Sequence, residues 1–80
     1  MLTAQTVYGR FSVRDLATDI LSDLASGTRA GRRDLKCRPS VVWELMITLR
    51  TFNPKIKIRN FETKRLSKNE RNYWFMFEVH

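Results

Sequence analysis

The chain has 80 residues, with 15 Lys and Arg against 8 Asp and Glu and a net charge of +7. This length suits one domain with a thin core, and no stretch reaches the roughly 20 apolar residues of a membrane span. The N-terminus lacks the regions of a signal peptide, and the single Cys37 excludes an intrachain disulfide. We therefore expect one basic, cytoplasmic domain over residues 1–80.

The first part of the chain predicts a short strand and a helix. Thr6 and Tyr8 alternate with polar neighbours, which indicates a strand over Thr3–Gly9. A helix is predicted over Ser12–Ser26, because Ser12 followed by Asp15 is typical of an N-cap and apolar residues recur at helical spacing. An acidic ridge lies outside that apolar stripe and consists of Asp15, Asp19 and Asp23.

The middle of the chain predicts a polar connection and a second helix. The segment Gly27–Arg38 is rich in Arg and Gly, and we expect a short helix over Arg29–Lys36, although Gly31 disfavours it. Pro39 suits the first turn of a helix, and Asn53-Pro54 ends it, so the second helix covers Pro39–Phe52.

The C-terminal part predicts a β-hairpin. Strands are expected over Lys55–Asn60 and Asn72–Val79, separated by a polar tip over Glu62–Arg71. The apolar face of such a hairpin must be covered, so the predicted fold class is α+β, with two main helices and a short third packed on the hairpin. The core is expected to include Val42, Leu45, Leu49, Ile56, Phe75 and Phe77.

This order of elements resembles the winged-helix domain, a helix-turn-helix variant with a β-hairpin wing. The resemblance rests on element order and charge. It implies that Ser12–Ser26 is the first helix, Arg29–Lys36 the second, Pro39–Phe52 the recognition helix and Glu62–Arg71 the tip of the wing. It also implies DNA binding, with the recognition helix in the major groove.

Positive charge is concentrated in the middle of the chain, because residues 29–71 hold thirteen Lys and Arg against four acidic residues. Arg and Lys side chains in two segments predict contacts with phosphates. We therefore expect a nucleic-acid-binding protein, with duplex DNA as the partner, such as a small phage or mobile-element regulator. The predicted nucleic-acid-binding residues are Arg29, Arg32, Arg33, Lys36, Arg38, Lys64, Arg65, Lys68 and Arg71.

The second helix supports an alternative function. Its outward residues include Glu44, Thr48, Thr51 and Arg50, so the face offers few side chains that read base edges. Trp43 and Ile47 stand one turn apart beside them, and Trp74 lies on the less apolar face of its strand. These three residues are the predicted anchors of a protein-binding inhibitor or adaptor that docks on an acidic protein surface. If DNA is the partner instead, Trp43 and Ile47 should be buried in the fold or in a homodimer.

Catalytic chemistry is not indicated by the sequence. No nucleophile and base pair, paired acids or glycine-rich phosphate loop is found, and no His or Cys lies near Cys37 to form a metal site. We therefore expect neither an enzyme nor a cofactor or metal. Cys37 is flanked by Lys36 and Arg38, whose charges would lower the pKa of a reactive thiol, but a plain thiol, packed or exposed, is the favoured interpretation.

Overall fold

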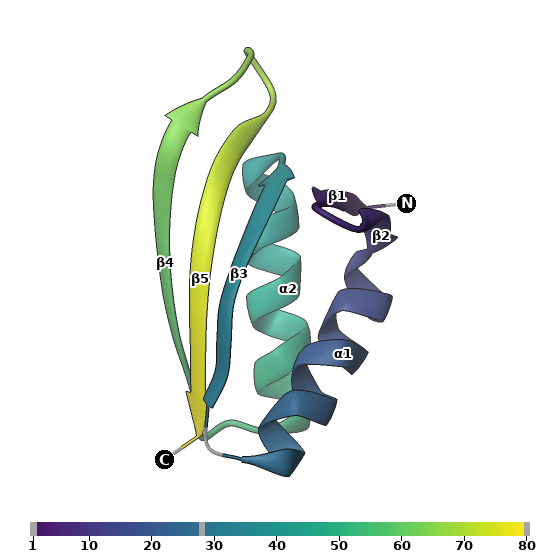
Figure 1. Cartoon of the computed structure of the whole chain (residues 1–80), viewed down its shortest axis with the longest axis vertical. Helices are drawn as coiled ribbons and strands as arrows, with labels where there is room; N and C mark the ends of the chain where they lie inside the picture. The colour runs from purple at the N-terminus through teal and green to yellow at the C-terminus, as the bar shows by residue number, and fades with distance from the viewer. Residues whose placement is uncertain (1, 28, 80) are drawn as a thin grey trace.

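A five-stranded antiparallel sheet carries both helices on one of its faces (Figure 1). The computed structural model describes residues 2–27 and 29–79, and the side chains of residues 29–31 lie outside the described part. The strand order is β2-β1-β3-β5-β4. In chain order the elements are β1 (Thr3–Thr6), β2 (Gly9–Ser12), α1 (Val13–Ser26), β3 (Arg29–Cys37), α2 (Pro39–Phe52), β4 (Ile56–Arg65) and β5 (Arg71–Val79).

The two main helices are confirmed. The Oγ of Ser12 accepts a hydrogen bond from the Asp15 N–H at 3.2 Å, which satisfies one free donor at the start of α1. Helix α2 has the predicted bounds and begins with Pro39. The N–H of Asn53 still donates to the Leu49 carbonyl at 3.0 Å before the chain leaves the helix. The local sequence signals at the helix ends therefore predicted the bounds of both helices.

The N-terminal strand proves to be a hairpin. The expected strand Thr3–Gly9 ends at Thr6, and β2, which was not predicted, pairs back along β1 through a turn at Val7 and Tyr8. The Thr6 hydroxyl stabilises this turn, because it donates to the Gly9 carbonyl at 2.9 Å and accepts from the Tyr8 N–H at 3.0 Å. Gly9 has a φ of 130°, a conformation that favours glycine.

The predicted short helix over Arg29–Lys36 is wrong, because this segment is strand β3. It pairs with β5 along most of its length and with β1 at one position, Gln5 opposite Lys36. Leu35 and Cys37 point into the core with the two-residue spacing of a strand. Pairing with β5 thus outweighed the weak helical tendency of an Arg-rich segment that contains Gly31.

The C-terminal hairpin is confirmed, with a longer first strand. Strand β4 starts at Ile56 and continues to Arg65, well beyond the expected end at Asn60, and β5 begins at Arg71. The predicted tip over Glu62–Arg71 therefore shrinks to residues 66–70. At that tip the N–H groups of Leu66 and Ser67 both donate to the Glu70 carbonyl.

The core lies between the helices and one face of the sheet. Phe75 and Phe77 of β5 are fully buried and their rings stack with centroids 5.7 Å apart. Leu45 and Leu49 of α2 are also fully buried. The predicted core is confirmed, since all six of its residues belong to one buried cluster: Val42, Leu45, Leu49, Ile56, Phe75 and Phe77.

Truncation of this core should be costly. We expect Leu45→Ala or Phe75→Ala to reduce the free energy of unfolding by about 2–5 kcal/mol, because each leaves a cavity in a small core. Urea unfolding followed by circular dichroism measures the change. Leu66→Ala at the exposed hairpin tip is the control. Equal midpoints for Leu45→Ala and the parent would show that the helix faces are wrongly assigned.

Candidate nucleic-acid interface

The face of the sheet that bears no helix is here called the open face. Side chains alternate along a strand, so the residues that flank Phe75 in β5 point away from the core. Cross-strand register then places the matching residues of β3 and β4 on the same face. The open face consists of Arg32, Asp34 and Lys36 of β3, Lys57, Arg59, Phe61 and Lys64 of β4, and Asn72, Trp74, Met76 and Glu78 of β5.

An aromatic pair occupies the middle of the open face. Phe61 and Trp74 are directly opposite each other on β4 and β5, and their rings stack with centroids 4.7 Å apart and planes inclined by 25°. The Phe61 side chain is 53% exposed, although its strand is paired with β5. The guanidinium carbon of Arg32 lies 5.2 Å from the centre of the Trp74 ring, which is cation–π geometry. An exposed ring, Phe61, and a half-buried ring, Trp74, therefore lie beside a cation.

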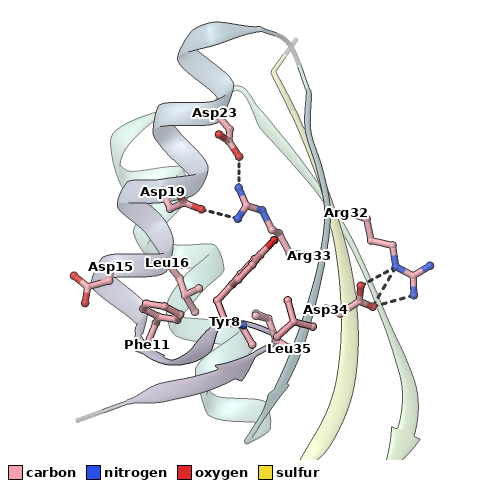
Figure 2. Close-up of a pocket in the computed structure, with 12 residues that line it drawn as sticks. Tyr8, Phe11, Asp15, Leu16, Asp19, Asp23, Arg32, Arg33, Asp34 and Leu35 are labelled. Carbon is pink, nitrogen blue, oxygen red and sulfur yellow. Dashed lines mark hydrogen bonds and ion pairs between the residues drawn. The ribbon is translucent and has the colours of Figure 1, made fainter.

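Cations frame this aromatic pair on both sides. Arg32 of β3 and Arg59 of β4 both stand opposite Met76 of β5. These two cations therefore lie in the cross-strand row next to that of the aromatic rings. Lys36 stands opposite Asn72 in the row on the other side of Trp74. The Arg32 guanidinium also forms an ion pair with the Asp34 carboxylate, with 2.9 Å between Nη2 and Oδ1. Figure 2 shows Arg32 and Asp34 pointing away from α1, on the side of β3 opposite Arg33.

Two of the predicted phosphate contacts point elsewhere. Arg33 faces α1 and forms ion pairs with Asp19 and Asp23, the first with a distance of 2.5 Å from Nη1 to Oδ2 (Figure 2). Arg71 pairs with Glu62, with 2.6 Å between Nε and Oε1. Both cations are only about a quarter exposed, at 24% and 23% of the side chain. These ion pairs connect β3 to α1 and β5 to β4, so the two arginines are poorly placed to bind a phosphate.

The remaining predicted contacts whose side chains are described lie in three places. Arg32 and Lys36 belong to the open face, as does Lys64, which stands opposite Asn72, whereas Arg65 and Lys68 are exposed near the tip of the β4–β5 hairpin. Arg38 is exposed where β3 passes into α2. The side chain of Arg29 lies outside the described part of the chain. The structure therefore does not gather the nine residues into one cluster.

Sequence reasoning missed part of the open face. Lys57 and Arg59 lie in the expected strand Lys55–Asn60 but are not among the predicted nucleic-acid-binding residues, and Phe61 falls between that strand and the expected tip. The two-residue spacing of Lys57, Arg59 and Phe61 was a usable signal, because it continues the alternation of Ile56 and Ile58 on the other face. It required the strand to extend past Asn60, and that extension depends on pairing with β5.

The predicted protein-binding anchors are also separated. Trp43 and Ile47 are 66% and 51% exposed on the outer side of α2, where they line a hollow of about 320 Å³ with Arg50. Trp74 lies on the open face, across the sheet from this helix. The structure therefore places an exposed tryptophan, Trp43, and a half-buried one, Trp74, on two distinct surfaces. Trp43 and Ile47 are not buried within the fold, so of the two places expected for them if DNA is the partner only a homodimer interface remains.

Cys37 is a packed thiol. Its side chain is 1% exposed, and burial, reinforced by the negative charge of Glu70, raises the pKa of the thiol from 9.0 to about 11. The neighbouring residues Lys36 and Arg38 are exposed and point away from it. Within residues 2–27 and 29–79, no three His, Cys, Asp or Glu side chains group closely enough to hold a metal ion. No helix in the same ranges is long and apolar enough to cross a membrane.

We expect Cys37 in the folded protein to resist modification by a maleimide at about pH 8, because only the thiolate attacks and the raised pKa leaves little of it. The same reagent should modify the protein rapidly in denaturing urea, which serves as the positive control. Mass spectrometry at timed intervals measures both rates. Fast modification of the folded chain would contradict the burial of this thiol.

No protein-family model matches the chain, and neither the curated proteins nor the solved structures contain a match to it. The winged-helix resemblance is thus neither supported nor opposed by a relative. The evidence for a function comes from the arrangement of the side chains, and above all from the open face.

Proposed function

We propose that this protein binds single-stranded nucleic acid across the open face of its sheet. The observation that carries the proposal is the stacked pair Phe61–Trp74, which lies among cations on the face without helices. Single-strand binders combine a positively charged track for the backbone with aromatic side chains on which bases stack. The open face has both components in neighbouring rows of the sheet.

The geometry favours unpaired bases over the duplex DNA expected from the sequence. In a duplex the flat faces of the bases are stacked on one another, so an exposed aromatic ring on a sheet has no free base face to stack on. Recognition of a duplex would depend on α2, whose outer side presents Trp43, Ile47 and Glu44. Of the Arg, Lys, Asn and Gln side chains that recognise base edges, this helix offers Arg50 alone. An unpaired base can stack on the free side of Phe61, while Arg59 and Lys57 in the same strand pair with phosphates.

The aromatic contribution is tested with two exposed phenylalanines. Phe61→Ala should weaken binding of a fluorescent mixed-sequence DNA 20-mer by about 1–3 kcal/mol, because one stacked base is lost. Phe52→Ala removes a phenylalanine that is 71% exposed on α2, and it should leave the affinity unchanged. Fluorescence anisotropy measures binding, and thermal melting establishes that both variants fold. Equal effects of the two substitutions would remove the open face from the interface.

The charge contribution is tested in the same assay by varying the salt concentration. Lys57→Ala combined with Arg59→Ala should reduce the slope of log affinity against log salt by about 0.7 for each lost phosphate contact. Arg14→Ala combined with Arg50→Ala removes the same charge at exposed positions of the two helices, off the open face, and should preserve the slope. Tighter binding of duplex than of the single strand would contradict the proposal.

A second candidate function is supported by the exposure of α2. Trp43 and Ile47 form an apolar patch one helical turn apart, and Phe52 adds an exposed ring at the end of the helix. Large exposed aromatic side chains beside a shallow hollow are typical of anchors for a protein partner. This patch supports the inhibitor or adaptor function, and it is separate from the open face.

Tryptophan fluorescence distinguishes the two surfaces. In Trp43→Phe the remaining Trp74 should be quenched when single-stranded DNA is added, because a base stacks beside it. In Trp74→Phe the remaining Trp43 should keep its emission, because α2 lies across the sheet. The free proteins provide the baseline. A response of Trp43 without a response of Trp74 would favour α2 as the functional surface.

A further inference from the structure

Among the residues that the structure describes, no strand pairs with one edge of β3 over most of its length. Strand β1 pairs with β3 at the single position of Gln5 opposite Lys36, and the chain then turns at Val7 and Tyr8 into β2. From residue 29 to Asp34, β3 therefore pairs with β5 on one side only, and the pairing is regular over residues 31–34 after a β-bulge between Arg29 and Gly31. In an antiparallel strand every second residue directs its N–H and C=O toward the other side. Such an unpaired edge is a template for another strand.

A groove of about 820 Å³ runs beside this edge, between β3, α1 and the β1–β2 turn (Figure 2). Leu16 of α1 and Leu35 of β3 are buried and form its apolar base. Phe11 and Tyr8 stand at the end nearest the turn, and Figure 2 shows the Tyr8 side chain directed along the groove toward Arg33. Tyr8 is 88% exposed, so most of its ring is available to a bound molecule.

The wall formed by α1 is acidic although the whole protein is basic. Asp15, Asp19 and Asp23 all line the groove. Arg33 engages Asp19 and Asp23, whereas the Asp15 carboxylate makes no ion pair within residues 2–27 and 29–79. The lining thus has a surplus of negative charge beside apolar surface. This charge disfavours phosphates, and it favours cationic side chains.

We propose that the edge of β3 accepts an extended polypeptide segment of a partner protein, with basic and apolar side chains on the face that enters the groove. The segment adds to the sheet antiparallel to β3, in line with β1 beyond Thr6. Main-chain hydrogen bonds to β3 provide the general affinity, and the acidic wall selects the sequence. The available edge corresponds to about six residues, or roughly 20 Å of strand. This site is distinct from the open face, although Arg32 and Asp34 of the open face also line the groove.

The test uses blocked hexapeptides and the full chain labelled with ¹⁵N. The probe is Lys-Thr-Val-Thr-Lys-Thr, in which the Lys and Val side chains share one face, and the matched control replaces both Lys by Glu. Titration into the millimolar range should shift the amide signals of β3 and α1 with the Lys peptide and not with the Glu peptide. Amides of alternate residues of β3 should also exchange more slowly with solvent in the complex.

Backbone N-methylation tests strand addition directly. Two further Lys peptides carry methyl groups on the odd or on the even residues, and only one of these sets directs its N–H groups to β3. One methylated peptide should therefore lose binding while the other keeps it. Equal behaviour of the two would overturn the proposal, because binding would then not involve main-chain pairing.

The acidic wall is tested with a conservative variant. Asp15→Asn should weaken the Lys peptide roughly two- to fivefold, as expected for one partly exposed ion pair, and Glu44→Gln on the outer side of α2 should have no effect. Single-stranded DNA binding by Asp15→Asn should remain at the parent level, which separates this site from the open face. Absence of any shift at millimolar Lys peptide, or shifts confined to β4 and Trp74, would overturn the proposal.

Discussion

The alternation of side chains along β5 is the constraint on which the rest of the structure depends. Phe75 and Phe77 point to one face and provide the largest buried side chains of the core. Trp74 and Met76 must then point to the other face, because neighbouring residues of a strand cannot share one. A chain of 80 residues has apolar material for one covered face only. Both helices therefore lie on the side of Phe75, and the opposite side stays open to solvent.

Because the helices cover only one face of the sheet, basic and acidic side chains lie on different surfaces of the molecule. Cations accumulate on the open face, where their long side chains remain hydrated and can surround the Phe61–Trp74 pair. The aspartates of α1 lie beside the groove at the β3 edge, with Arg33 between two of them. A net charge of +7 thus conceals two surfaces of opposite character. A polyanion and a basic peptide would be attracted to different sides of the same domain.

Arg33 illustrates how position within a strand decides the role of a charged residue. Arg32 and Arg33 are adjacent and chemically identical, yet they point to opposite faces of β3 (Figure 2). Arg32 lies by Trp74, and Arg33 ties β3 to α1 through Asp19 and Asp23. A cluster of basic residues in a strand therefore provides about half of its members to any one surface. This is why the nine residues expected to contact phosphates do not form one site.

The sequence by itself determined the two helices, the C-terminal hairpin and the six core residues, because caps, Pro39 and the apolar periods are local signals. It also indicated that Trp74 lies apart from the buried face of β5. Only the tertiary structure decided that Arg29–Cys37 is a strand and that β4 continues to Arg65, since both depend on pairing with β5. Without those pairings Phe61 has no position relative to Trp74. The open face and the free β3 edge exist because strands distant in sequence are neighbours, and no local pattern records which strands those are.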